Sequence, residues 1–171
     1  MYPIYKGTYE RNDGFNPYTA TISFLREIYI KGGNDFQRSI DYLESRKDID
    51  VEKLAYHGIS GGAAVGPAVL AIENRIKAGI FELGGFYCFK HPPEIDIINF
   101  TPRVKCPVLM LNGRYDYRFP LETYSKPMFD LLGTPEEHKR LIIYDTGHGT
   151  PRKEKIKEIL DWLDRYLGPV K

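Results

Sequence analysis

Apolar residues in the first third of the chain recur at three- and four-residue steps, the spacing of an amphipathic helix. The pattern covers residues 18–29 and breaks at Gly32-Gly33, a pair typical of helix ends, so we predict that a first helix stops there. A second helix, capped by Asn34 or Asp35, is predicted to run to Arg46.

The rest of the chain alternates short apolar runs with longer helical patterns. The run at residues 105–112 is apolar almost throughout, which is typical of a strand covered on both faces in a parallel sheet. Strands that alternate with helices indicate an α/β fold, a mostly parallel sheet flanked by helices. Residues 1–17 are dense in Gly, Pro, Asn and Asp and are predicted to form a loop. The predicted strands are a short run before Gly58 and residues 78–84, 105–112 and 139–145; the predicted helices are 63–72, 121–132 and 155–167.

The segment Gly58-Ile-Ser-Gly-Gly62 predicts a sharp turn between a strand and a helix. In a G-x-S-x-G turn, the small residues on either side of the serine let strand and helix approach closely, and the serine hydroxyl is exposed at the apex. Ser60 is therefore the candidate nucleophile. The amide of Gly61, with the helix N-terminus behind it, is the candidate oxyanion donor. The alternative is a glycine-rich turn in which Ser60 only caps the helix.

Asp116 and His148 each come just after one of the predicted strands. In a parallel sheet both emerge at the same carboxyl edge as Ser60, the edge at which such sheets bind ligands. A histidine there can take the serine proton, and a carboxylate can orient the imidazole, so these three residues form a predicted catalytic triad. Glu122 and Asp145 are weaker candidates for the acid. For Asp116 the alternative is a solvated loop carboxylate.

Five segments of the chain carry a common pattern: residues 38–44, 53–62, 107–116, 147–149 and 162–170. Together they resemble the α/β-hydrolase superfamily, in its prolyl-oligopeptidase-like and dienelactone-hydrolase-like branch, whose triads also run serine, aspartate, histidine along the chain. The resemblance implies that residues 1–171 form a single, truncated α/β-hydrolase domain that matches the C-terminal part of the fold. It also implies a serine hydrolase that cleaves an ester or a small amide or peptide bond through an acyl-enzyme intermediate.

The same resemblance implies that the first strands of the family's sheet, and the loop that supplies a second oxyanion donor, are absent from residues 1–171. The strand before Ser60 would then have an exposed apolar edge, which an upstream domain or another copy of the chain would cover. The loss of one oxyanion donor typically slows such enzymes on the order of 10²–10³-fold. The alternative function is a non-catalytic hydrolase-like domain that needs a missing N-terminal segment or an oligomer partner. Acyl transfer to an alcohol would use the same residues as hydrolysis.

Four aromatic residues that follow strand ends are candidate walls of a substrate pocket: Phe86, Tyr87, Tyr117 and Phe119. The alternative is that these rings only pack against their neighbours. His57 is predicted to pack beside the turn that carries Ser60.

Composition narrows the possible partners. With 24 basic and 23 acidic residues the net charge is +1, which gives no electrostatic reason to expect nucleic acid or an anionic membrane. No apolar run has the length of a membrane span and the first residues lack a signal-peptide layout, so a cytoplasmic location is predicted. Cys88 and Cys106 have no metal-binding spacing and are expected to be ordinary thiols. The predicted chemistry, on an ester or peptide substrate, needs no metal or organic cofactor.

Overall fold

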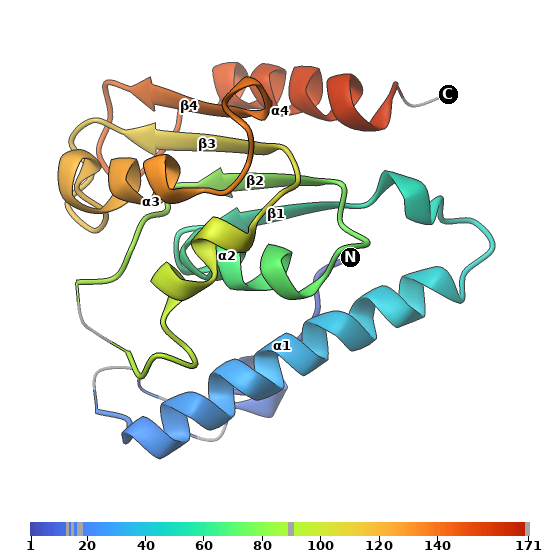
Figure 1. Cartoon of the computed structure of the whole chain (residues 1–171), viewed down its shortest axis with the longest axis vertical. Helices are drawn as coiled ribbons and strands as arrows, with labels where there is room; N and C mark the ends of the chain where they lie inside the picture. Colours follow the sequence, from blue (N-terminus) through green and yellow to red (C-terminus); the bar gives the residue numbers. More distant parts are fainter. Residues whose placement is uncertain (13, 15, 17–18, 89–90, 170–171) are drawn as a thin grey trace. The chain divides into compact units, whose positions relative to one another are not determined.

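The computed structural model describes residues 1–12, 14, 16, 19–88 and 91–169 (Figure 1). The chain forms two compact units. One comprises Met1–Val51 and Lys90–Asp96, and the other comprises Glu52–Phe89 and Ile97–Lys171. The prediction of a single domain over residues 1–171 stays a prediction. Among the described helices, none combines the length and the apolar character that a membrane crossing requires.

The first unit is built on one long helix, α1 (Ile22–Glu44), which Thr21 caps by accepting the amide proton of Phe24. The prediction of two helices separated at Gly32-Gly33 is wrong. Neither glycine has the positive φ that ends a helix, and the buried residues Ile28, Phe36 and Ile40 lie at multiples of four along the same face. Burial of this continuous face stabilises the helix by more than the two glycines cost.

Asp35 lies inside α1, so the prediction that Asn34 or Asp35 caps a second helix is also wrong. The Asp35 carboxylate instead accepts hydrogen bonds from the amide of Lys6, at 2.9 Å, and from the guanidinium of Arg11, at 2.7 Å. These bonds hold the N-terminal segment against the middle of the helix. Among its described residues, 1–12, 14 and 16, this segment is irregular apart from a short 3₁₀ turn at Tyr9–Arg11, as its composition predicts. Residues 13, 15 and 17 of the predicted loop lie outside the described residues.

The second unit contains a four-stranded parallel sheet in the order β1-β2-β3-β4 (Figure 1). The strands are β1 (Ala55–Ile59), β2 (Ala78–Glu82), β3 (Val108–Gly113) and β4 (Lys139–Tyr144), and the helices are α2 (Gly61–Ile72), α3 (Lys126–Leu131) and α4 (Arg152–Leu167). Every residue of β2 and β3 is buried. The predicted α/β class, a parallel sheet flanked by helices, is confirmed.

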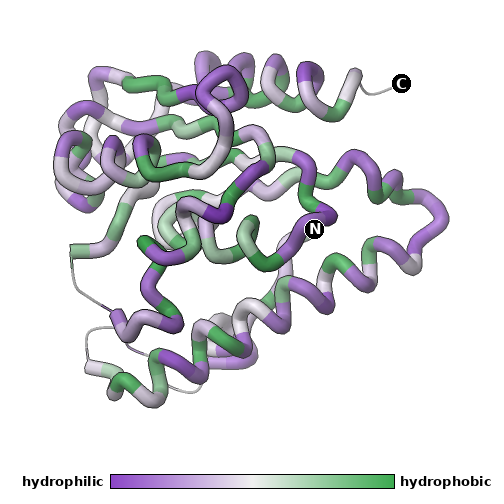
Figure 2. The backbone as a smooth tube through the Cα atoms, in the orientation of Figure 1, coloured by the Kyte–Doolittle hydropathy of each residue, from purple (hydrophilic) through white to green (hydrophobic). Residues whose placement is uncertain are grey.

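The two central strands are buried because helices cover both faces of the sheet. On one face, Ile80 and Leu109 form a core with Trp162 of α4, a helix along which hydrophobic and hydrophilic residues alternate (Figure 2). On the other face, the Phe81 ring lies against Gly66 of α2, where a Cβ would be 2.3 Å from the ring. The apolar runs of β2 and β3 therefore follow from burial on both sides.

The shorter helical segments differ slightly from the predictions. The predicted helix over residues 121–132 is a π-helical turn, Leu121–Ser125, followed by α3. Short 3₁₀ turns occur at Val51–Lys53, Ile97–Asn99, Thr101–Arg103 and Glu136–His138.

Strand β1, which leads to Ser60, is at the edge of the sheet. It pairs with β2 on one side, and no strand of the described residues pairs with its other side. Ile59 is 51% exposed. The predicted open edge is thus present in the described part of the chain, and its coverage by an upstream domain or a second copy stays a prediction.

The continuity of α1 predicts the effect of a glycine substitution. A Cβ at Gly32 would meet no atom within 4 Å, so Gly32→Ala should raise the free energy of unfolding by about 0.5–1 kcal/mol, because alanine loses less backbone entropy in a helix. Urea unfolding followed by far-ultraviolet circular dichroism measures the change. A loss of stability would contradict the continuous helix.

Candidate active site

Ser60 lies at the junction of β1 and α2 with a backbone conformation that is rare for a residue with a side chain. Its φ is 53° and its ψ is −114°. Such a conformation costs on the order of 1–3 kcal/mol and persists only where its surroundings impose it. Here the Ser60 amide donates to the carbonyl of Glu82, at 2.8 Å, and the Ser60 carbonyl accepts from the amide of Ala64, at 2.9 Å.

The side chain of Ser60 makes no hydrogen bond that caps α2, so the alternative reading of this residue as a helix cap is wrong. Gly61 is the first residue of the helix and is exposed. The first amides of a helix have no acceptor within it, and the helix dipole adds partial positive charge there. The Gly61 amide is thus chemically suited to an oxyanion.

Glycine is required at the turn because the strand and the helix nearly touch. A Cβ on Gly58 would lie 2.5 Å from the carbonyl carbon and oxygen of Gly62. A Cβ on Gly84, just after β2, would lie 2.5 Å from the Cβ of Ala63. The small residues of the motif therefore allow the backbone contact that forces Ser60 into its strained conformation.

The structure brings the three predicted triad residues into one hydrogen-bonded chain. The Ser60 hydroxyl oxygen is 2.9 Å from Nε2 of His148, and Nδ1 of His148 is 2.8 Å from Oδ2 of Asp116. The Asp116 side chain is fully buried, and that of His148 is 17% exposed. With the Nδ1–H tautomer, His148 donates to Asp116 and presents its Nε2 lone pair to the serine hydroxyl.

The carboxylate of Asp116 is held by its own loop. Its second oxygen, Oδ1, accepts the amide protons of Arg118, at 2.8 Å, and Phe119, at 3.1 Å. Asp116 is therefore not a solvated loop carboxylate. The two weaker candidates for the acid are exposed and paired elsewhere: Asp145 with Arg114, at 2.7 Å, and Glu122 with Lys126, at 3.7 Å.

The loop that carries His148 is packed against the end of β3. The carbonyl of Thr146 accepts the amide proton of Tyr115 at 2.9 Å. A Cβ on Gly113 would lie 2.0 Å from the carbonyl oxygen of Gly147, so the two loops approach through a glycine. Asp116 and His148 are thus positioned on two loops whose backbones are in contact.

Three of the four predicted pocket aromatics lie near these residues. The ring of Phe119 is 6.1 Å from the imidazole of His148 and 6.0 Å from the ring of Tyr87, and the ring of Tyr117 is 6.2 Å from His148. The hydroxyl of Tyr87 lies 3.7 Å from the position of a Cβ on Gly61. Phe119 is buried, whereas Tyr117 is exposed.

Phe86, the fourth predicted pocket residue, is anchored through its backbone. Its amide donates to the carbonyl of Tyr124 at 3.1 Å. Contacts of these four aromatic residues with a substrate stay predictions.

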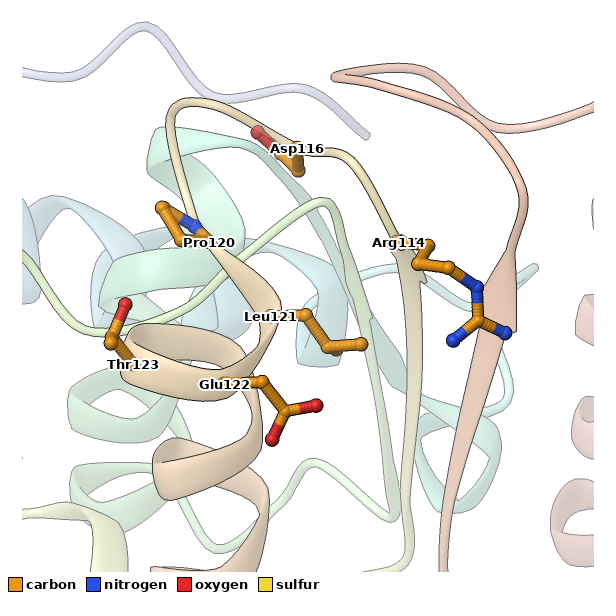
Figure 3. Close-up of a pocket in the computed structure, with 6 residues that line it drawn as sticks. All are labelled: Arg114, Asp116, Pro120, Leu121, Glu122 and Thr123. Carbon is orange, nitrogen blue, oxygen red and sulfur yellow. The ribbon is translucent and has the colours of Figure 1, made fainter.

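A pocket of about 310 Å³ opens on the Asp116 side of the site (Figure 3). Its lining residues are Arg114, Asp116, Pro120, Leu121, Glu122 and Thr123. Leu121 and Glu122 come from the π-helical turn that follows the Asp116 loop (Figure 3). The pocket thus places a charged and partly apolar wall beside the triad acid.

A buried carboxylate that the sequence analysis missed lies beneath the site. Glu82, at the end of β2, is 2% exposed and contacts three side chains: Nε2 of His57 at 3.1 Å, Nζ of Lys155 at 2.5 Å, and the hydroxyl of Thr150. His57 therefore lies beside the turn and contacts this carboxylate. One sequence feature could have indicated this buried carboxylate: it is a single acidic residue at the end of the otherwise apolar run Ala78–Glu82.

Burial by itself would raise the pKa of Glu82, but hydrogen bonds from His57, Lys155 and Thr150 outweigh it and lower the pKa to about 2. The carboxylate is therefore ionised at neutral pH despite its burial.

Within the described residues, no group of three or more His, Cys, Asp or Glu side chains is arranged to hold a metal ion. Cys88 and Cys106 are both free thiols, and burial raises the pKa of Cys106 to about 11. Of the remaining histidines, His91 packs against Tyr29 of α1, and His138 contacts the hydroxyl of Tyr166 at 3.1 Å.

No family model matches the chain. Among curated proteins, it is 24% identical over 170 residues to the acetyl esterase Axe7A of Xylanibacter ruminicola, in a match that covers 84% of the chain. The chain spans 37% to 51% of the length of the curated relatives it matches.

Solved structures share the fold. An acetyl xylan esterase from Paenibacillus sp. R4 has a TM-score of 0.70 at 20% identity, over 82% of this chain and 54% of that one. The acylaminoacyl peptidase of Pyrococcus horikoshii has a TM-score of 0.70 at 20% identity, over 92% of this chain and 31% of that one. These likenesses confirm the predicted resemblance to the fold of the α/β-hydrolase superfamily.

The close approach at the turn predicts a loss of stability for one glycine substitution and not for its neighbour. Gly58→Ala should destabilise the protein by about 1–3 kcal/mol, because the new methyl group would overlap the backbone of Gly62. The matched control is Gly61→Ala, whose methyl would make only an ordinary contact at 3.7 Å. Urea unfolding of both variants tests this, and equal stabilities would contradict the described turn.

The depressed pKa of Glu82 predicts a pH dependence of stability. Its pKa of about 2 in the folded protein is below the ordinary 4.5, so its contribution is fully present above pH 4.5 and is lost as the pH falls toward 2. The difference in unfolding free energy between wild type and Glu82→Gln should therefore narrow by roughly 2 kcal/mol between about pH 6 and pH 3. Urea titrations across this range measure it. A constant difference would show that Glu82 is not held in its ionised form.

Proposed function

We propose that this protein is a serine hydrolase that cleaves a carboxylic ester or a small amide through an acyl-enzyme intermediate. The observation that carries the proposal is the chain of hydrogen bonds from Ser60 to His148 to Asp116, at 2.9 Å and 2.8 Å. A nucleophile, a base and an orienting acid in hydrogen-bond contact are the arrangement that activates a serine.

In the proposed reaction, Nε2 of His148 removes the hydroxyl proton as Oγ of Ser60 attacks the carbonyl carbon. Asp116 holds the imidazole in the Nδ1–H tautomer and stabilises the imidazolium. The negative oxygen of the tetrahedral intermediate is stabilised by the amide of Gly61 at the N-terminus of α2. His148 then returns the proton to the leaving alcohol or amine, and the same steps with water as nucleophile release the acid and restore the serine.

Esters of short acids are the first substrates to test. The curated relative Axe7A is an acetyl esterase, and one of the structural neighbours is an acetyl xylan esterase. The proposal takes from them only the chemical class, a carboxylic ester with a small acyl group. A small amide is the second class, since a structural neighbour is an acylaminoacyl peptidase.

The open edge of β1 favours one alternative function, a hydrolase-like domain without catalysis of its own. In that case the edge would bind an upstream segment or a second copy of the chain, which the domain would need, and the Ser60 site would not catalyse hydrolysis. This alternative predicts a folded wild-type protein that does not react with a probe of active serines.

Labelling with a fluorophosphonate probe and hydrolysis of p-nitrophenyl acetate test the proposal. Wild type should react with both. Ser60→Ala and His148→Ala should lose labelling, and Asp116→Asn should lower kcat on the order of 10³–10⁴-fold because the imidazole loses its orienting partner. Ser45→Ala, at an exposed serine after α1, is the matched control and should behave as wild type. A folded wild type that neither labels nor turns over substrate would overturn the proposal.

A further inference from the structure

Glu82 contacts both the turn that carries Ser60 and the loop that carries His148, through different atoms. Its backbone carbonyl accepts the amide proton of Ser60 at 2.8 Å, and in the sheet register it lies opposite Ile59, the residue before the serine. Its side-chain carboxylate accepts the hydroxyl proton of Thr150, two residues after His148. One residue of β2 therefore contacts the backbone of the nucleophile and the loop of the base.

The loop that carries His148 is attached at two points. Before the histidine, the carbonyl of Thr146 bonds to the amide of Tyr115, beside the end of β3. After the histidine, the attachment to β2 is made by the side chains of Thr150 and Lys155, which both contact Oε1 of Glu82, Lys155 at 2.5 Å. His148 lies between the two attachments, so loss of either one weakens the restraint on the position of the imidazole relative to Ser60.

The carboxylate is well suited to this role. It is 2% exposed, so water does not compete for its oxygens, and both oxygens have donors: Oε2 contacts His57, and Oε1 contacts Thr150 and Lys155. Charge-assisted hydrogen bonds of this kind are about twice as strong as neutral ones. The pKa of about 2 agrees with a carboxylate that stays ionised while its partners are in place.

We propose that Glu82 is a positioning residue for hydrolysis, which acts through Thr150 to hold His148 at the distance from Ser60 that proton transfer requires. The inference rests on the proposed function. Glu82 does not touch the substrate. Its effect comes from the accuracy of placement, since a displacement of about 1 Å in a reacting group can cost on the order of 10²-fold in rate. It therefore affects kcat and leaves KM nearly unchanged.

The test uses Thr150, because its substitution leaves the ionic contacts of Glu82 in place. Thr150→Val removes the hydroxyl at nearly constant volume and should lower kcat for p-nitrophenyl acetate roughly 10-fold or more, with KM within about twofold. Thr150→Ser keeps the hydroxyl and should restore kcat to within about threefold of wild type. Thr150→Val in a Glu82→Gln background tests the coupling between these two residues. The decrease in kcat that Thr150→Val causes should be smaller in this background than in the wild-type background.

The matched control is Thr134→Val. This threonine is buried, whereas Thr150 is half-buried, and its hydroxyl donates to the carbonyl of Cys106 at 2.8 Å, away from the loops that carry Asp116 and His148. The variant should lose stability and keep the wild-type kcat, so it separates a general effect of a lost hydrogen bond from an effect on His148.

The outcomes distinguish the two proposals. An active wild type whose Thr150→Val variant is folded and keeps kcat would overturn the role of Glu82 and leave the hydrolase proposal intact. A rise in KM at unchanged kcat would also overturn it, because Thr150 would then bind substrate rather than position the base. A folded wild type without activity would overturn both proposals.

Discussion

The backbones of β1 and α2 meet at Gly58 and Gly62, where a single added carbon would lie 2.5 Å from the neighbouring chain. This contact turns the chain so sharply that Ser60 adopts a φ of 53°, and its side chain makes no hydrogen bond that caps α2. The strain is tolerated because both backbone groups of Ser60 are hydrogen-bonded, one of them to the buried strand β2. Without this contact the serine would be an ordinary helix cap.

The parallel sheet converts three separate loops into one site. Ser60, Asp116 and His148 follow β1, β3 and β4, and parallel strands end at the same edge. Ser60 and His148, 88 positions apart in the chain, and Asp116 and His148, 32 positions apart, therefore come into hydrogen-bond contact. Glu82 also joins segments that are distant in the chain, because its side chain, at the end of β2, accepts a hydrogen bond from Thr150 in the loop after β4.

In the first unit the structure differs from the helix pattern that the sequence predicts. Gly32-Gly33 is typical of a helix end, but glycine also adopts helical angles, and the stripe of Ile28, Phe36 and Ile40 continues across the pair. The glycine pair favours a helix end, whereas burial of the same face on both sides of the pair favours one continuous helix. The structure has the continuous helix. The predicted cap at Asp35 is wrong for the same reason, because its partners, Lys6 and Arg11, are more than 20 residues away in the chain.

The sequence by itself determined the fold class and the order of strands and helices in the second unit, and it indicated the three residues that the structure joins by hydrogen bonds at the candidate site, because periodic burial and glycine spacing are local properties of the chain. Only the tertiary structure decided the continuity of α1, the partners of Asp35, and the network around Glu82. Each of these depends on side chains that are distant in sequence and meet through folding, and no local pattern specifies which distant groups a buried carboxylate will contact.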